Sequence, residues 1–386
     1  MKKKMIALVL TAAAVVTMAS AAFAASPVGL VIDGVRQNPS VAPIVENGTT
    51  LVPLRLISET LGAEVSWNQS AGQATIQTAA YTVVFTVDSK SYTVNGQGKT
   101  LLSAPKLING STMVPIRAFA EAIGATVNYD ASSNTATVDY FTAMSGTLKI
   151  DGSTTLQPIA QAAADKLTGM NKGLSVTVAG GGSGAGIKDA DAGTVNIGMS
   201  SRELTADEKK TLNVYAVAND GIAIIVHPDN PVKNLTKEQA AKIFLGETKN
   251  WKDVGGEDAP IMVMTRETGS GTRSTLEEMI LSKESVVETA TPHTSSTLIK
   301  QAVAKDKNAV GFDSIGFVDG TVKAVSLDGK EASAATVIDG TYGMGRQLFC
   351  CTKGAATGVS AMFIDYLRSK DCQDNIVAKE GYVKLG

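Results

Sequence analysis

Residues 146–386 alternate short apolar strands with amphipathic helices, and this alternation restricts the fold more than any other feature of the sequence. Strands are expected at 147–150, 174–179, 195–199, 221–226, 260–265 and 346–352, and helices at 158–167, 205–211, 237–245 and 272–281. Thr236 and Gln239 have the spacing of a capping box at the start of one helix. Alternation of this kind predicts open α/β sheets covered by helices, which bind ligands at the carboxyl ends of their strands.

Three of the strand-to-helix turns carry small hydroxyl and glycine residues. They are Asp151-Gly-Ser-Thr-Thr155, Gly180-Gly-Gly-Ser-Gly-Ala-Gly186 and Arg266-Glu-Thr-Gly-Ser-Gly-Thr272. Free N–H groups at a helix start, together with the positive end of the helix dipole, attract anions, and glycine lets the backbone approach closely. Arg266 can add a fixed bidentate charge. If the three turns converge, they enclose a tetrahedral oxyanion.

Several other kinds of site are excluded by residue type. The glycine run at 180–186 is followed by Ile187, where a Walker A loop needs lysine, and it lacks the acidic partner of a dinucleotide fingerprint. Two histidines and three cysteines leave little material for metal sites or His-based catalysis. The net charge of −2 is a poor match for nucleic acid. We therefore expect no cofactor, no metal and no enzymatic activity.

The first 25 residues have the pattern of a secretory signal peptide. Three lysines precede an apolar run that ends in Ala22-Phe23-Ala24, which predicts cleavage after Ala24 or Ala25. No cysteine stands next to the cleavage point, so a lipid anchor is not expected. The protein is therefore expected to be exported to the periplasm or the cell surface or wall.

A duplicated unit occupies residues 26–141. The segments 48–67 and 110–129 match at a constant offset of 62, which pairs Pro53 with Pro115 and Gly62 with Gly124. Each copy is expected to form a strand, a helix whose first turn carries the proline and whose end is the glycine, and two further strands. Arg55–Glu59 and Arg117–Glu121 are expected to be solvated pairs. The repeats resemble the copper amine oxidase N-terminal-like (stalk) domain, and we expect a spacer, a cell-wall-binding module or an inert extension; no copper ligands occur there.

Residues 146–386 resemble the substrate-binding proteins of phosphate ABC transporters. The similarity is carried by motifs such as Gly152-Ser-Thr-Thr155, Asn250-Trp-Lys-Asp-Val-Gly-Gly256, Arg266-Glu-Thr-Gly-Ser-Gly-Thr-Arg273 and Ala309-Val-Gly-Phe312. The resemblance implies a two-lobed periplasmic-binding-protein (type II) α/β fold with a hinge, preceded by the duplicated α+β stalk. Lobe 1 is expected at about 146–218 and 335–386, and lobe 2 at about 219–334. The chain is then expected to cross between lobes near 217–221 and 327–334.

The same resemblance implies which residues bind inorganic phosphate. They are Thr154 and Thr155 of the first turn, Ser183 of the second, Ser201 after the next strand, and Arg266, Ser270, Gly271 and Thr272 of the third. The family usually places an aspartate at the position of Ser201, where it accepts the proton of hydrogen phosphate and rejects sulfate. Glu203 and Asp220 are alternative acceptors, and the sequence leaves the choice open.

The expected function is capture of phosphate by closure of the two lobes, followed by delivery to the permease and ATPase subunits of an ABC transporter. Two alternatives stay open: a binder of sulfate, molybdate or tungstate, and an envelope-structural or adhesive protein that uses the stalk. Cys350 and Cys351 are adjacent on an expected strand, and a bridge from either to Cys372 is left undecided. Both histidines are expected to be structural or exposed.

Overall fold

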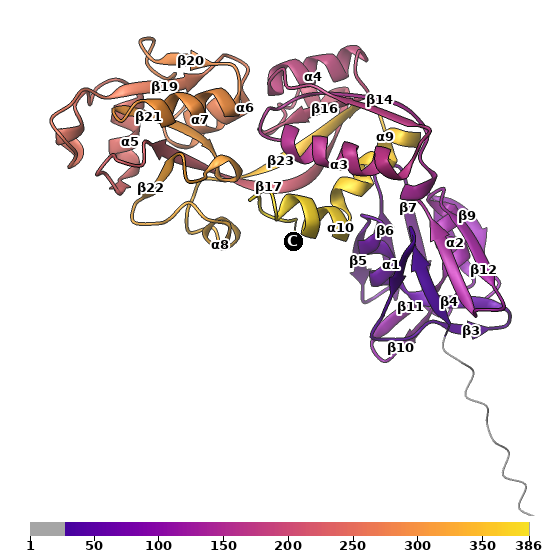
Figure 1. Ribbon diagram of the computed structural model, residues 1–386. Helices are drawn as coiled ribbons and strands as arrows, with labels where there is room; N and C mark the ends of the chain where they lie inside the picture. The colour runs from indigo at the N-terminus through magenta and orange to yellow at the C-terminus, as the bar shows by residue number, and fades with distance from the viewer. Residues whose placement is uncertain (1–27, 386) are drawn as a thin grey trace, which may run out of the picture.

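The computed structural model describes residues 28–385, so the expected signal peptide at 1–25 lies outside the described residues. The described chain forms a β-rich stalk followed by two α/β lobes (Figure 1). Within residues 28–385, none of the helices combines the length and the apolar character that crossing a bilayer demands.

Both halves of the stalk have the strand, helix and hairpin order predicted from the repeat. The first copy is β4 (Thr49–Pro53), α1 (Leu54–Thr60), β5 (Glu64–Asn68) and β6 (Gln73–Gln77); the second is β11 (Ser111–Pro115), α2 (Ile116–Ala122), β12 (Thr126–Asp130) and β13 (Thr135–Asp139). Gly62 and Gly124 follow the helices with φ of 73° and 86°, which left-handed helix ends require. One detail of the prediction was wrong: Pro53 and Pro115 end the strands and directly precede the helices instead of lying in the first turn.

Strands of the two copies pair with each other and join the copies into one unit. β4 pairs with β11 in the sheet β10-β11-β4-β3, with Val52 opposite Val114. The N-terminal β1 pairs in parallel with β13 of the second copy, in the sheet β12-β13-β1-β2, and a third sheet has the order β5-β6-β7-β8-β9. The remaining stalk strands are β1 (Gly29–Ile32), β2 (Val35–Gln37), β3 (Ile44–Glu46), β7 (Thr82–Thr86), β8 (Ser91–Val94), β9 (Gln97–Thr100) and β10 (Lys106–Ile108). The two copies therefore form one folded unit.

The two lobes share one hydrogen-bonded ladder because β17 (Leu212–Val226) runs through both of them (Figure 1). Its first part pairs with β23 (Gly345–Lys353), and its last part pairs with β21 (Ala309–Ser314) and β22 (Lys323–Leu327). The ladder order is β15-β14-β16-β23-β17-β21-β19-β20, with β22 and β18 (Asn234–Leu235) to the side. The other strands are β14 (Gly146–Gly152), β15 (Leu174–Val178), β16 (Ile197–Ser200), β19 (Met262–Arg266) and β20 (Thr291–His293).

Helices cover the sheet of each lobe. Those of lobe 1 are α3 (Gln157–Met170), α4 (Ser183–Ala192), α9 (Gly358–Arg368) and α10 (Lys370–Cys372); those of lobe 2 are α5 (Lys237–Phe244), α6 (Gly271–Met279), α7 (Ser296–Lys305) and α8 (Ala334–Ile338). The large buried side chains fall into two main clusters, one in lobe 2 and one that extends from lobe 1 into the stalk. This arrangement confirms the predicted two-lobed α/β fold.

Two predicted elements differ from the structure. The expected helix at 205–211 is only a 3-10 turn at Glu208–Lys210, because the Glu208 carboxylate accepts hydrogen bonds from Arg202 and from the N–H of Thr205. The strand expected from 221 begins at Leu212, because residues 212–221 pair with β23. The capping box of Thr236 and Gln239 is confirmed.

The packing around α8 bears on where the lobes divide. Tyr342 and Met344 belong to the buried cluster of lobe 2, and the Tyr342 hydroxyl donates to the carbonyl oxygen of Ile222 at 2.9 Å. We therefore propose that the second crossing lies at about Met344–Gly345, later in the chain than 327–334.

All three cysteines are buried free thiols. Cys350 and Cys351 lie on β23 and Cys372 on α10, and burial raises the pKa of Cys351 to about 12. A thiol with so high a pKa is a weak nucleophile, so these residues act as small apolar core residues.

The stalk is attached to lobe 1 through a buried carboxyl group on α9. Asp365 accepts hydrogen bonds from the N–H of Ala79 at 2.7 Å and from the Tyr140 hydroxyl at 2.8 Å. A Cβ atom at Gly62 would overlap the backbone of Asp365, and Arg368 pairs with Glu64. Burial raises the pKa of Asp365 to about 7.

This pKa gives the interface a predictable pH dependence. The pKa of this carboxyl group is higher in the folded protein than its ordinary value of about 3.9. The free energy of unfolding therefore falls as the pH rises between those two values, by up to about 1.4 kcal/mol per pH unit. We expect Asp365→Asn to remove this loss. The unfolding temperature of the variant minus that of wild type should then rise from pH 5 to pH 7 and level off above pH 7. Circular dichroism melts over this pH range measure it.

Asp130→Asn is the matched control in the stalk. Hydrogen bonds from the Ser132 and Ser133 hydroxyls lower the pKa of this exposed carboxyl to about 2. Its difference from wild type should stay constant from pH 5 to pH 8. A constant difference for Asp365→Asn as well would contradict the assignment.

Candidate anion-binding site

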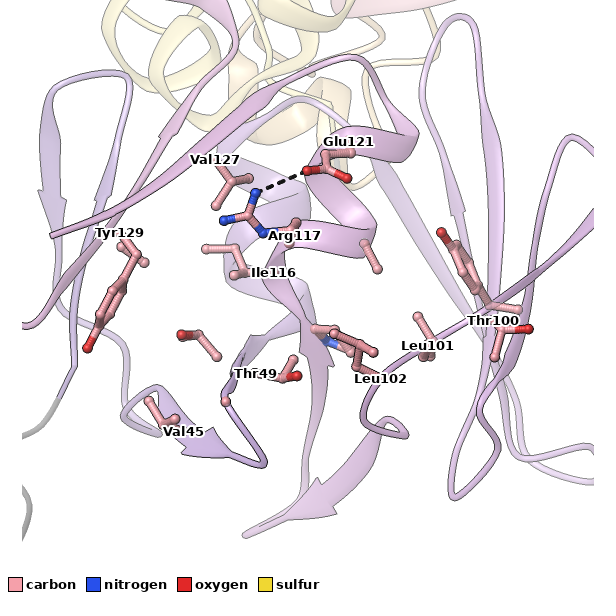
Figure 2. Close-up of a pocket in the computed structure, with 16 residues that line it drawn as sticks. Val45, Thr49, Thr100, Leu101, Leu102, Ile116, Arg117, Glu121, Val127 and Tyr129 are labelled. Atoms are coloured by element: carbon pink, nitrogen blue, oxygen red, sulfur yellow. Dashed lines mark hydrogen bonds and ion pairs between the residues drawn. The ribbon is translucent and has the colours of Figure 1, made fainter. Parts of the chain in front are cut away.

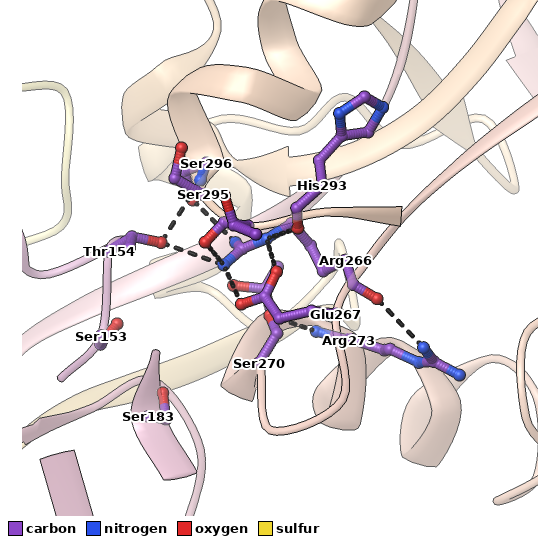
Figure 3. A network of polar contacts seen from close by, with 12 residues as sticks. Ser153, Thr154, Ser183, Arg266, Glu267, Ser270, Arg273, His293, Ser295 and Ser296 are labelled. Atoms are coloured by element: carbon purple, nitrogen blue, oxygen red, sulfur yellow. Dashed lines mark hydrogen bonds and ion pairs between the residues drawn. The ribbon is translucent and has the colours of Figure 1, made fainter. Parts of the chain in front are cut away.

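The three hydroxyl-glycine turns lie at the carboxyl ends of strands and meet between the lobes. The first follows β14, the second follows β15 and leads into α4, and the third joins β19 to α6. Figure 3 shows Thr154 and Ser183 of lobe 1 facing Arg266 and Ser270 of lobe 2. The sequence therefore located the three turns, and the fold brings them together.

Hydrogen bonds connect the turns across the gap between the lobes. The Arg266 guanidinium donates to the Thr154 hydroxyl at 3.1 Å, and the hydroxyls of Thr155 and Thr272 lie 3.1 Å apart. The N–H of Gly184 donates to the carbonyl oxygen of Gly269 at 2.9 Å. The two lobes thus stand in contact at this point.

The predicted site residues are all shielded from solvent. None of the side chains is more than 5% exposed, and Gly271 is buried as well; the set is Thr154, Thr155, Ser183, Ser201, Arg266, Ser270, Gly271 and Thr272. Buried hydroxyl and N–H groups need hydrogen-bond partners, and an anion can accept from many of them at once. The arrangement is suited to a dehydrated oxyanion.

Arg266 is held rigidly in this site. Its Nε and Nη2 atoms donate to the Glu267 carboxylate at 3.2 and 3.0 Å, and Nε also donates to the His293 carbonyl oxygen at 3.1 Å. Nη1 donates to the Ser296 hydroxyl at 3.3 Å. Figure 3 shows these contacts fixing the plane of the guanidinium. A fixed fork of donors recognises an oxyanion without losing further side-chain entropy.

Helix N-termini add to the positive potential. α4 begins at Ser183, α6 at Gly271 and α7 at Ser296, and all three residues are buried in or beside the site. Each N-terminus presents unpaired N–H groups and a partial positive charge. Together with Arg266 they favour an anion in this place.

The structure shows the surroundings of the three acceptors that the sequence left open. The Ser201 hydroxyl lies 3.2 Å from that of Ser183. Glu203 is exposed and pairs with Lys209 at 2.9 Å, so it points away from the site. Asp220 is buried, but its carboxylate already accepts from Arg346 at 2.8 Å and from the Ser314 hydroxyl at 2.6 Å. Glu203 therefore lies outside the predicted site, and both oxygens of Asp220 already have partners.

Three further residues lie against the predicted site and were missed from the sequence: Ser296, Arg346 and Asp313. Ser296 links Arg266 with Thr155, and Arg346 donates to the Ser201 carbonyl oxygen at 3.0 Å. Asp313 is fully buried at the end of β21. A signal existed for Ser296, since Thr294-Ser295-Ser296 is a fourth hydroxyl run between a strand and a helix. Nothing local marked Arg346 or Asp313, whose positions depend on strand pairing.

A groove in the stalk has a different character. Its volume is about 580 Å³, and apolar side chains such as Leu101, Ile116 and Val127 line much of it (Figure 2). Its charged lining residues, Arg117 and Glu121, form an exposed ion pair at 3.3 Å, as predicted. Without a buried unpaired cation, this groove does not resemble an anion site.

The absence of a side chain at Gly271 permits the contact between lobes. A Cβ atom there would lie 2.5 Å from the Ser183 hydroxyl oxygen and 2.6 Å from that of Ser201. We expect Gly271→Ala to separate the lobes and to increase the radius of gyration measured by small-angle X-ray scattering. Gly320→Ala, where the added Cβ would meet no atom within 4 Å, is the control and should scatter like wild type. Identical curves for all three proteins would show that Gly271 does not limit closure.

Comparison with known proteins agrees with this geometry. Residues 116–371 match the PBP superfamily domain, and residues 31–138 match the copper amine oxidase N-terminal domain. The phosphate-binding protein PstS of Bacillus subtilis is 36% identical over 247 residues, which cover 62% of this chain and 81% of the relative. PstS of Pseudomonas aeruginosa is 30% identical over 272 residues, covering 63% of this chain and 84% of the relative.

Solved structures are similar over the same region. A phosphate ABC transporter substrate-binding protein from Clostridium perfringens with bound phosphate has a TM-score of 0.60 at 38% identity, covering 62% of this chain and 100% of that one. An ABC-type phosphate transport receptor from Vibrio cholerae has a TM-score of 0.54 at 35% identity, with the same coverage. The chain therefore belongs to the periplasmic-binding-protein superfamily and, within it, to the family of PstS phosphate-binding proteins, with a copper amine oxidase N-terminal-type stalk in front.

Proposed function

We propose that this protein captures inorganic phosphate outside the cytoplasm and delivers it to an ABC transporter. The observation that carries the proposal is the convergence of three buried hydroxyl-glycine turns on the fixed Arg266 guanidinium, with donors from both lobes. The names of the PstS relatives and the phosphate-bound homologous structure support it.

In this proposal each lobe supplies part of the hydrogen-bond donors that bind the tetrahedral anion. Thr154, Thr155, Ser183 and Ser201 donate from lobe 1, and Arg266, Ser270, Gly271 and Thr272 donate from lobe 2. Closure of the lobes satisfies both sets of donors at once, so the ligand stabilises the closed form by its higher affinity for it. The closed complex is the form that the permease and ATPase subunits would recognise.

We further propose that the protein binds and releases its ligand unchanged. The relatives are named as binding proteins and transport receptors, which supports this role. The expected signal peptide would place the chain in the periplasm or at the cell surface. We propose that the stalk binds cell-wall material and acts as a spacer between the cell wall and lobe 1.

Removing the guanidinium tests the proposal. We expect Arg266→Met to weaken phosphate binding by roughly thirtyfold to several thousandfold, because loss of a buried charged donor costs about 2–5 kcal/mol. Isothermal titration of phosphate into the purified protein measures this. Arg117→Met, in an exposed pair of the stalk, should bind like wild type. A wild-type protein that gives no heat with micromolar phosphate would refute the function.

A binder of another oxyanion is the second candidate because hydroxyl groups, not a carboxylate, stand at Ser183 and Ser201. A hydroxyl group does not repel a fully ionised anion. Competition of sulfate, molybdate and tungstate against phosphate in the same titration decides between them. Displacement of phosphate by an equal concentration of sulfate would favour the wider specificity.

A further inference from the structure

Asp313 lies beside the anion site without an assigned role. β19 and β21 pair in parallel with Met262 opposite Ala309 and Val263 opposite Val310, and this register continued places Asp313 beside Arg266. The Asp313 side chain is 0% exposed. Its Oδ1 accepts from the N–H of Ser314 at 2.9 Å, whereas Oδ2 has no hydrogen-bond partner among the described residues.

The buried charges around Asp313 leave this carboxylate without a counter-ion of its own. Arg266 is already paired with Glu267, and Arg346 with Asp220. Tyr382 interacts with Asp313, and His293 lies near Arg266; burial raises the pKa of Tyr382 and lowers that of His293, which keeps both neutral. Burial raises the pKa of Asp313 to about 7, although Ser296, the Ser314 N–H and the two arginines favour its charged form.

A chain of hydroxyl groups connects Asp313 with the site. The Ser296 side chain lies close enough to the Asp313 carboxyl group to favour its charged form, although no hydrogen bond joins it to Oδ2. The Ser296 hydroxyl is 3.5 Å from that of Thr155, which is 3.1 Å from that of Thr272, and either oxygen of each pair can be the donor. Each hydroxyl has one hydrogen, so the direction of the chain depends on the group at its end.

The charge of Asp313 therefore sets which way these hydrogens point. An ionised Asp313 draws the Ser296 hydrogen toward itself and leaves oxygen lone pairs facing the anion. A protonated Asp313 can donate to the Ser296 oxygen, and the Ser296 hydrogen is then free to point along the chain toward the anion. An anion also raises the pKa of a neighbouring carboxyl group by like-charge repulsion. Both effects favour a neutral Asp313 in the loaded site.

We propose that Asp313 takes up one proton from solvent when the site captures its anion, and that the neutral acid directs the hydroxyl chain toward that anion. The inference rests on the proposed function. The proton forms an O–H bond on the Asp313 carboxylate, and no bond of the anion is broken. Asp313 is thus a group that couples anion affinity to pH.

Proton counting by isothermal titration tests the proposal. At about pH 8.5 phosphate in solution is largely the dianion, and Asp313 with a pKa of about 7 is largely ionised. The binding heat is measured in buffers of different ionisation enthalpy, and the slope gives the protons taken up per phosphate. We expect about one for wild type. Phosphate binding without proton uptake would overturn the inference and leave the proposed function intact, whereas absence of phosphate binding would overturn both.

Asp313→Asn separates this role from a structural one. The amide is neutral at every pH and can still donate to Ser296, so we expect this variant to bind phosphate with almost no proton uptake. Above pH 7 the ratio of wild-type Kd to variant Kd should rise toward tenfold per pH unit, because the titration of phosphate itself cancels in the ratio. Glu203→Gln, an exposed acid of lobe 1, should count protons like wild type.

The outcomes are separable. A Kd ratio that does not change with pH, or equal proton uptake by Asp313→Asn and wild type, would overturn the assignment to Asp313. If Asp313→Asn fails to fold, the wild-type proton count still decides whether capture and protonation are coupled. Ser296→Ala then decides whether the coupling passes through the hydroxyl chain, since it should weaken binding and reduce the proton count together.

Discussion

The buried guanidinium of Arg266 is the constraint on which the site depends. A positive charge in a dry interior is tolerated only when its donors are satisfied and its charge is balanced. Here Glu267 and the His293 carbonyl oxygen satisfy one edge, while Thr154 from the other lobe accepts from Nη2. The remaining capacity is directed to where the three turns meet. In the proposed function, an anion there would be a further partner for this guanidinium.

The connection between the lobes has to return these groups to the same geometry each time the lobes close. β17 and β23 pair from lobe 1 to the boundary, with a shift of register between Ala216 and Ala218 and with Asp220 directly opposite Arg346. Such a buried ion pair contributes little net stability, but it orients its members. Arg346 uses its free Nη1 to hold the Ser201 carbonyl oxygen. The connection is therefore a pair of strands with a buried ion pair between them.

Local signals predicted much of this molecule. Glycine and hydroxyl residues mark strand-to-helix turns because the backbone there needs unusual angles and helix-start N–H groups need partners, and these signals located Thr154, Ser183 and Ser270. The offset of 62 residues likewise fixed the duplicated stalk. Asp313, Arg346 and the docking of Asp365 on the stalk were not predictable in this way, because their partners are set by strand register and by contacts across more than 200 residues. The 3-10 turn at Glu208–Lys210 was mispredicted because a side-chain ion pair overrode helix propensity.

Equivalent residues of the two repeats have different surroundings. Gly62 and Gly124 end equivalent helices with similar φ, yet Gly62 packs against the backbone of Asp365 while a Cβ atom at Gly124 would meet nothing within 4 Å. The stalk core is continuous with that of lobe 1, and the buried cluster of lobe 2 is separate. The stalk and lobe 1 therefore act as one body. Bending of the β17–β23 ladder must then move lobe 2, with Arg266, toward a site half that the stalk holds in place.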